Sequence, residues 1–166
     1  MNNFNLHTPT RILFGKGAIA GLREQIPHDA RVLITYGGGS VVRSGLLERV
    51  KKALAGFEVV EFSGIEPNPR VSSVNAAAKL AREQKADFIV AVGGGSVIDA
   101  SKAIAAVVKY EGDAWDLVKD GSLIKDALPL FSVLTLAATG SEYDAPGVIS
   151  NMQTNEKQAI SSPLLF

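Results

Sequence analysis

Short apolar runs alternate along the chain with longer segments in which apolar residues recur at helical spacing. Three of these runs, Arg31–Tyr36, Glu58–Phe62 and Asp87–Val92, are rich in Val and Ile, which is typical of strands buried inside a sheet. Arg11–Gly15 and Leu128–Leu136 also have the length and composition of strands. The pattern therefore predicts a sheet built from several short strands.

Helices are expected between these runs, over residues 17–26, 44–54, 71–84 and 96–110. Ser44 is the expected cap of the second helix, and Gly56 is expected to end it. Residues 111–127 are expected to be less regular, and a polar tail with Gly147–Ser150 and Lys157 ends the chain. Strands and helices that alternate through short connections predict an α/β fold, with a parallel sheet and helices on both faces.

Composition narrows the classes of function. Lys and Arg together number 17, as do Asp and Glu, so the formal net charge is zero and a broad nucleic-acid-binding surface is not expected. The 166 residues include no Cys and two His, which excludes disulfides, thiolate chemistry and a His-rich metal centre. The chain shows neither a signal peptide nor an apolar run long enough for a bilayer, so we expect a cytoplasmic domain without a membrane partner.

The sequence GGGSV occurs twice, at Gly37–Val41 and Gly93–Val97, each time between an expected strand and an expected helix. Backbone amides without side chains can approach a phosphate closely, and the start of a helix adds partial positive charge. Alternatively, the glycines only form tight turns, and Ser40 and Ser96 cap the helices. Because both bends should lie at the carboxyl edge of one sheet, we favour anion binding.

Other motifs qualify this interpretation. Val42 and Ile98 stand where the dinucleotide fingerprint has its third glycine, and no P-loop or serine-hydrolase pattern is present. A cluster of hydroxyl residues, Thr135–Glu142, follows the last strong strand. Asp99 and Lys102 stand one helical turn apart, either to orient the glycine bend and balance phosphate charge or as a surface ion pair.

These motifs together resemble the N-terminal half of iron-containing alcohol dehydrogenases. The resemblance is carried by GGGS at Gly37–Ser40, by Pro67-Asn68-Pro69, by Gly93–Asp99 with Lys102, and by Thr135–Glu142. The segment Met1–Gly39 is most similar to the branch of NADPH-dependent butanol dehydrogenases and broad-specificity aldehyde reductases. The resemblance implies a Rossmann-like nucleotide-binding domain over residues 1–166, in a dehydroquinate synthase-like fold.

The resemblance also implies a coenzyme site. Gly93, Gly94, Gly95 and Ser96 would hold the pyrophosphate with Asp99 beside them, Thr135 and Thr139 would line the nicotinamide side, and Asn68 and Lys157 would add weaker contacts. The first bend, Gly37, Gly38, Gly39 and Ser40, would meet the adenosine ribose. Members that use NAD usually carry an acidic residue at the position of Gly38, so NADP is expected rather than NAD. Arg43 is a further candidate for the 2′-phosphate.

Family members continue into a helical domain that binds a divalent metal, iron or zinc, through an aspartate and three histidines. These ligands would lie beyond Phe166, so no catalytic or metal-binding residue is expected in this chain, and alone it should have little activity on alcohols or aldehydes. The family forms dimers through N-terminal strands, here Asn3–Leu6 and Arg11–Phe14. A glycerol dehydrogenase-type coenzyme domain, or a non-catalytic excised or designed domain, remain the alternatives.

Overall fold

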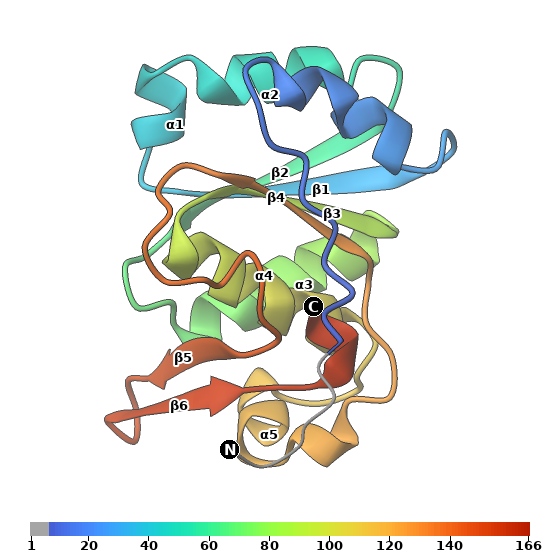
Figure 1. Ribbon diagram of the computed structural model, residues 1–166. Helices are drawn as coiled ribbons and strands as arrows, with labels where there is room; N and C mark the ends of the chain where they lie inside the picture. Colours follow the sequence, from blue (N-terminus) through green and yellow to red (C-terminus); the bar gives the residue numbers. More distant parts are fainter. Residues whose placement is uncertain (1–6) are drawn as a thin grey trace.

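A parallel sheet forms the centre of the computed structural model, which describes residues 7–166 (Figure 1). Its four strands lie in the order β2-β1-β3-β4. They are β1 (Arg31–Gly37), β2 (Glu58–Ile65), β3 (Phe88–Gly93) and β4 (Leu130–Leu134). An antiparallel hairpin of β5 (Gly147–Asn151) and β6 (Glu156–Ile160) follows at the C-terminal end. The parallel α/β sheet expected from the sequence is confirmed.

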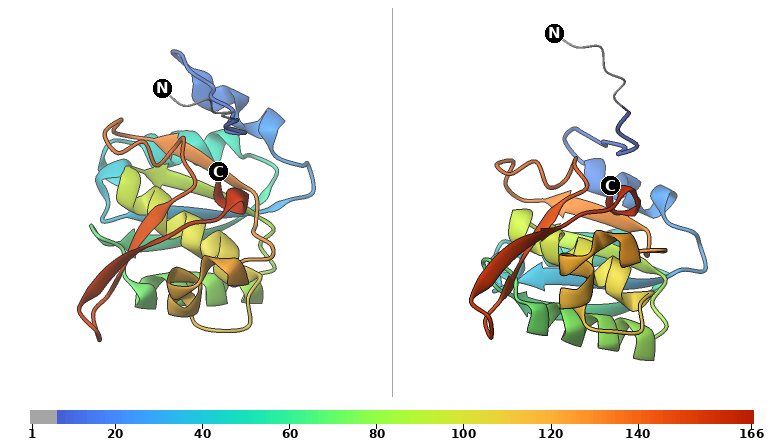
Figure 2. Two further views of the ribbon diagram at one scale, coloured as in Figure 1. Left: turned by 60° about the horizontal axis from the view of Figure 1, so that its bottom comes forward. Right: turned by 90° about the horizontal axis from the view of Figure 1, so that it is seen from below.

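Helices cover both faces of the sheet (Figures 1 and 2). One face carries the 3₁₀ helix η1 (Ala18–Gln25), α1 (Ser40–Arg43) and α2 (Leu46–Ala53). The other face carries α3 (Val71–Glu83) and α4 (Gly95–Val108), and the hairpin packs against α4 and α5 (Ala114–Lys119). Two short 3₁₀ turns, η2 (Gly121–Leu123) and η3 (Pro163–Leu165), complete the chain.

The two central strands, β1 and β3, are mostly apolar because helices cover them on both faces. Leu33 and Ile89 point into the core beneath α3 and α4, whereas their neighbours Ile34 and Val90 point into the core beneath α2. Successive side chains of a strand face opposite sides, so a strand covered on both faces needs apolar residues in every position. The predicted helix over residues 96–110 is confirmed as α4, and most of its side chains are buried.

A buried pair of hydroxyl groups joins β1 to α4 close to the carboxyl edge of the sheet. The Ser101 hydroxyl donates to the Val97 carbonyl at 2.6 Å, and Thr35 lies 2.7 Å from the same hydroxyl. Since Ser101 has one proton to give, Thr35 must be the donor in the second bond. This pair satisfies both polar groups and fixes α4 against β1 beneath the glycine bends.

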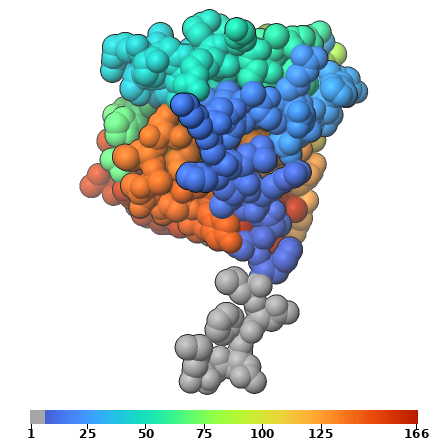
Figure 3. All heavy atoms as spheres, turned by 45° about the horizontal axis from the view of Figure 1, so that its top comes forward, coloured from blue at the N-terminus to red at the C-terminus, as the bar shows by residue number. Residues whose placement is uncertain are grey.

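Two local predictions were wrong. Arg11–Gly15 is an irregular segment rather than a strand, and it lies across β4 and the residues after β4 (Figure 3). Gly45, with a φ of 71°, is the N-cap of α2, and Ser44 instead donates its hydroxyl to the Val41 carbonyl. The tail from Gly147 forms the β5–β6 hairpin. Asn3–Leu6, expected to pair between two copies, lies outside the described residues.

None of the helices in residues 7–166 is long and apolar enough to cross a lipid bilayer.

Candidate functional site

The two glycine bends lie at the same edge of the sheet, as the sequence predicts, and the structure places them side by side. Their strands β1 and β3 pair in parallel, so both chains leave the sheet at its carboxyl edge. A Cβ built on Gly37 would lie 3.6 Å from the Val97 side chain, which belongs to the helix that follows the second bend. We call Gly37–Ser40 the first bend and Gly93–Ser96 the second bend.

The second bend is closely packed, and glycine is required there for steric reasons. A Cβ on Gly93 would lie 2.7 Å from the Cβ of Val97, and one on Gly95 would lie 2.5 Å from Oγ1 of Thr139. At Gly94 the nearest atom, Oγ1 of Thr135, would be 3.9 Å away, which is an ordinary contact. Packing therefore explains two of the three glycines, while the third leaves room in front of its backbone.

Neither serine of the bends acts as a helix cap. Gly39, with a φ of 104°, is the N-cap of α1, and Gly94 is the N-cap of α4; the described chain provides no side-chain cap at either place. The alternative in which Ser40 and Ser96 cap their helices is therefore wrong. Since α4 has 14 residues, its uncapped start offers amides without an intrahelical acceptor and the positive end of a helix dipole.

The first bend is open where the second is crowded. Among residues 7–166 no heavy atom lies within 4 Å of a Cβ built on Gly38, and the φ of Gly38 is not in the left-handed region. Arg43 extends back toward this bend, so that its Nη1 atom would lie 3.4 Å from a Cβ on Gly39. The first bend thus combines free space with a nearby guanidinium group.

The residues between β4 and β5, which we call the hydroxyl loop (residues 135–146), lie against the second bend. The Thr135 amide donates to the Gly93 carbonyl at 3.0 Å, and Thr139 is the residue that fills the space beside Gly95. The Ser141 amide in turn donates to Oγ1 of Thr139 at 3.3 Å. Both threonines expected at the nicotinamide side therefore border the bend expected to hold the pyrophosphate.

Asp99 and Lys102 do not pair with one another. The Asp99 carboxylate accepts hydrogen bonds from the Ser141 hydroxyl and the Val148 amide. Lys102 is buried, with 2% of its surface exposed, and donates to the Asp144 side chain and to carbonyl groups of the hydroxyl loop. The alternative of a surface ion pair between them is therefore wrong.

Asn68 and Lys157 meet at the same end of the molecule as the bends. The Lys157 ammonium on β6 donates to Oδ1 of Asn68 at 2.6 Å, and Asn68 has a left-handed φ of 56° in the turn after β2. The Ser150 amide of β5 also donates to the Pro69 carbonyl at 2.8 Å. These contacts join the hairpin to the turn and bring the two expected coenzyme contacts together.

A charged cluster supports the end of β1 just before the first bend. Tyr36 donates its hydroxyl to Glu61 at 3.0 Å, and the Lys51 ammonium lies 2.8 Å from the same carboxylate. The hydrogen bond from Lys51 lowers the pKa of Glu61, and burial followed by the bond to Glu61 raises the pKa of Tyr36. An ion pair thus connects α2 with β2, and the hydrogen bond from Tyr36 connects β1 to the same carboxylate.

We expect this cluster to lose its stabilising effect in acid. The pKa of Glu61 is lower in the folded chain than in the unfolded chain, so its contribution is present above the unfolded value and disappears as the pH falls through the folded value. Urea unfolding of the wild type and Glu61→Gln checks this: their midpoints should differ at pH 7 and converge near pH 3. A constant difference at both pH values would contradict the role of the charge.

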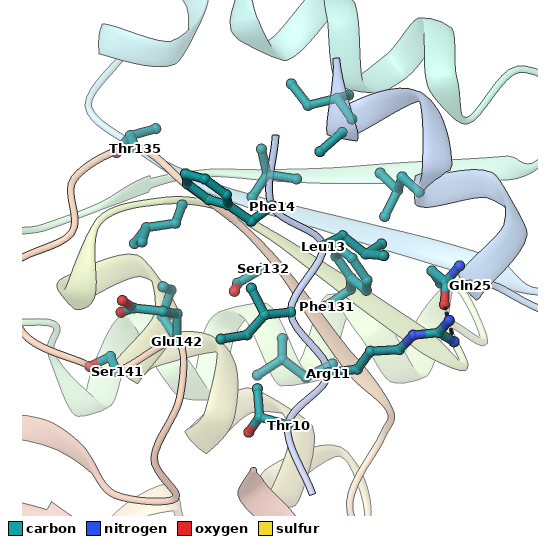
Figure 4. Close-up of a pocket in the computed structure, with 18 of the residues that line it drawn as sticks. Thr10, Arg11, Leu13, Phe14, Gln25, Phe131, Ser132, Thr135, Ser141 and Glu142 are labelled. Carbon is teal, nitrogen blue, oxygen red and sulfur yellow. Dashed lines mark hydrogen bonds between the residues drawn. The ribbon is translucent and has the colours of Figure 1, made fainter. Parts of the chain in front are cut away.

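A cavity of about 940 Å³ lies between the N-terminal segment and β4 (Figure 4). Leu13 and the exposed Phe14 border one side, and Thr135, Ser141 and Glu142 bring polar groups to the other. Oε2 of Glu142 is buried and has no hydrogen-bond partner among residues 7–166. The hydroxyl loop therefore lines this cavity with hydroxyl and carboxylate groups.

A family model described as iron-containing alcohol dehydrogenase matches residues 9–166. The chain belongs to this family. It is 62% identical over 165 residues to the NADPH-dependent aldehyde reductase YqhD of Escherichia coli, and 53% identical over 169 residues to the probable NADH-dependent butanol dehydrogenase 1 of Bacillus subtilis. These matches cover 98% and 100% of this chain but 43% and 44% of the relatives, so the chain spans less than half of their length.

Solved structures of the family have the same fold. The crystal structure of YqhD from E. coli K-12 superposes with a TM-score of 0.93 at 62% identity, covering 97% of this chain and 42% of that one. The structure of NADH-dependent butanol dehydrogenase A from Thermotoga maritima gives 0.95 at 44% identity, over 100% of this chain and 43% of the other. The family and the fold inferred from the sequence are thereby confirmed.

Sequence reasoning missed the partners of the polar residues on α4. Asp144, Pro146 and Val148 all bond to that helix from 42 to 49 residues away in the chain. A signal was present, because an aspartate and a lysine on an otherwise apolar helix must find partners where they are buried. Glu142, in contrast, is marked in the sequence only by its place after the hydroxyl residues.

Proposed function

We propose that this chain binds a nicotinamide dinucleotide, preferably NADP, for an alcohol dehydrogenase or aldehyde reductase that interconverts a primary alcohol and an aldehyde. The observation that carries the proposal is the adjacency of the two glycine bends at the carboxyl edge of the sheet. The named activities of the relatives, NADPH-dependent aldehyde reduction and NADH-dependent butanol oxidoreduction, support the reaction class.

The second bend suits the pyrophosphate. The uncapped start of α4 directs free amides outward, and Gly94 leaves space before its backbone, so phosphate oxygens can come close to Gly94, Gly95 and Ser96. Thr135 and Thr139 then stand beside the phosphates on the nicotinamide side. Asn68 and Lys157, already joined by a hydrogen bond, add an amide and an ammonium group at the same end.

The first bend suits the ribose that carries the 2′-phosphate. A carboxylate at the position of Gly38 would repel a phosphate, whereas Gly38 leaves open space and Ser40 supplies a hydroxyl. Arg43 brings the guanidinium group toward Gly39. The coenzyme that this chemistry favours is therefore NADP.

We expect Gly38→Asp to weaken NADPH binding by about ten-fold or more, because the new carboxylate would repel the 2′-phosphate. A ten-fold loss of affinity corresponds to about 1.4 kcal/mol of binding free energy. The backbone tolerates the change, because a Cβ at Gly38 meets no described atom within 4 Å. Titration followed by the fluorescence of the reduced nicotinamide measures the loss, with NADH titrated in parallel.

Gly38→Asn is the matched control, because it has nearly the same size without the charge. It should retain most of the preference for NADPH, whereas Gly38→Asp should reverse or abolish it. Equal affinities for NADPH and NADH in the wild type, unchanged by the aspartate, would contradict the assignment of the first bend.

Hydride transfer in the family also calls for a divalent metal, which would polarise the oxygen of the alcohol or aldehyde when bound. Within residues 7–166 no group of three or more His, Asp or Glu side chains comes together to hold such an ion. We therefore propose that this chain supplies coenzyme binding and orientation, and that it has little dehydrogenase activity by itself. We also propose a homodimer that involves the N-terminal residues, which sedimentation can test.

A further inference from the structure

Helix α4 carries a stripe of small and charged residues toward the hydroxyl loop. Gly95, Asp99 and Lys102 are spaced by four and three residues, so they follow one another along one face of the helix. Each of them contacts a different part of the chain that follows β4. The three residues therefore contact the hydroxyl loop at successive points.

Asp99 contacts the middle of the hydroxyl loop and the start of β5. One carboxylate oxygen accepts from the Ser141 hydroxyl, and the other accepts from the Val148 amide at 3.0 Å. The approach of the backbone is close as well, since a Cβ on Gly147 would lie 3.1 Å from the Asp99 carbonyl oxygen. The Asp99 side chain thus joins the hydroxyl loop to the first strand of the hairpin.

Lys102 contacts the part of the hydroxyl loop that lies between Ser141 and Val148. Its ammonium group donates to the Asp144 carbonyl, to the Asp144 carboxylate at 3.0 Å and to the Pro146 carbonyl at 2.9 Å. All three N–H donors of this buried cation are used, and the negative charge beside it is supplied by Asp144. Removing the ammonium group would leave two loop carbonyls without a donor.

We propose that Asp99 and Lys102 are positioning residues, which hold the hydroxyl loop so that Thr135 and Thr139 face the nicotinamide end of the coenzyme. This inference rests on the proposed function for the identity of the ligand. In this proposal the Asp99 carboxylate and the Lys102–Asp144 pair hold the hydroxyl loop in position and do not bind phosphate directly. Loss of the Lys102–Asp144 pair releases the hydroxyl loop, while the first bend keeps its conformation.

Amide hydrogen exchange tests the loop directly. The Tyr143 and Asp144 amides donate to the Gly140 carbonyl at 2.8 and 3.2 Å, so their exchange reports local opening of the loop. In Lys102→Met and in Asp144→Ala we expect their exchange to accelerate by about ten-fold or more, while amides of β3 keep their rates. Asp144→Asn retains an acceptor at the same place and should restore slow exchange.

Ligand binding tests the consequence. Lys102→Met and Asp144→Ala should weaken NADPH by about ten-fold, yet bind 2′,5′-ADP, which lacks the nicotinamide half, as the wild type does. Lys109→Met serves as the matched control, because it breaks an exposed ion pair with Asp126 at 3.5 Å just after α4. It should change neither the exchange of the loop nor either affinity.

The outcomes separate the two proposals. Unchanged exchange of the loop in Lys102→Met and Asp144→Ala overturns the positioning role, whatever the ligand. Equal weakening of NADPH and 2′,5′-ADP also overturns it, because the effect would then not be confined to the nicotinamide end. A wild type that binds neither ligand overturns the proposed function, and the exchange experiment alone then decides the role of the loop contacts. Should Lys102→Met fail to fold, Asp144→Ala gives the decision, since the Asp144 side chain is 47% exposed.

Discussion

Gly95→Ala is expected to weaken NADPH binding by about 100-fold, or about 2.7 kcal/mol. The added methyl group would lie 2.5 Å from Oγ1 and 3.2 Å from Cβ of Thr139, so rotation of the threonine side chain cannot remove the conflict. Either the hydroxyl loop moves away from the second bend or the start of α4 shifts. Both changes separate the amides that we propose bind phosphate from the residues proposed for the nicotinamide side, and fluorescence titration with NADPH measures the loss.

Two variants sharpen this test. Gly21→Ala adds the same methyl group on η1, where no described atom lies within 4 Å, and should bind NADPH as the wild type does. Thr139→Ala in the Gly95→Ala background removes the two nearest atoms and should relieve the steric conflict, but it should not restore the contact that we propose between Thr139 and the coenzyme. Wild-type affinity in Gly95→Ala would mean that the coenzyme does not bridge the second bend and the hydroxyl loop.

The sheet could be predicted from the sequence because its central strands leave no ambiguity. Arg31–Tyr36 and Asp87–Val92 are apolar in nearly every position, and each is ended by glycines. A strand that is covered on both faces produces this pattern, and the structure places both strands at the centre. Because parallel strands share one carboxyl edge, the sequence predicts that both bends lie at that edge, but only the structure shows that β1 and β3 are neighbours in the sheet.

The segments at the periphery could not be predicted in the same way. Arg11–Gly15 has the residues of a strand but no strand beside it in the described chain, and composition alone does not supply a pairing partner. In β6 the residues Glu156–Ala159 are exposed, so no alternation of apolar and polar positions announces the strand. The pairing of β5 with β6 depends on contacts between the two strands, which the residue pattern within β6 does not predict.

The loop contacts of α4 depend on distances along the chain that no local motif encodes. Spacing alone allowed an ion pair between Asp99 and Lys102, because residues three apart are neighbours on an exposed helix. In the structure the same face is buried by the hydroxyl loop, and each side chain bonds to that loop instead. The sequence shows that glycines end both strands, but only the structure distinguishes those fixed by packing from the open Gly38.

Gly93→Ala is expected to destabilise the fold by about 3 kcal/mol, at the upper end of the usual cost of overpacking a core. The new methyl group would lie 2.7 Å from the Cβ and 2.6 Å from Cγ2 of Val97, which is itself buried at the start of α4. A change of rotamer moves Cγ2 but not Cβ, so the helix or the end of β3 must move. Urea unfolding monitored by the fluorescence of Trp115 measures the difference in free energy.

Gly94→Ala separates packing from phosphate binding at the neighbouring position. Its methyl group would lie 3.9 Å from Oγ1 of Thr135, so the free energy of unfolding should remain close to that of the wild type. If the backbone of Gly94 meets the pyrophosphate, however, the same methyl group stands between them and NADPH binding falls. Val97→Ala in the Gly93→Ala background should restore only part of the stability, because the Cβ of residue 97 remains at 2.7 Å. Wild-type stability of Gly93→Ala would show that the end of β3 and the start of α4 can separate freely, and the second bend would then have no fixed geometry with which to bind a diphosphate.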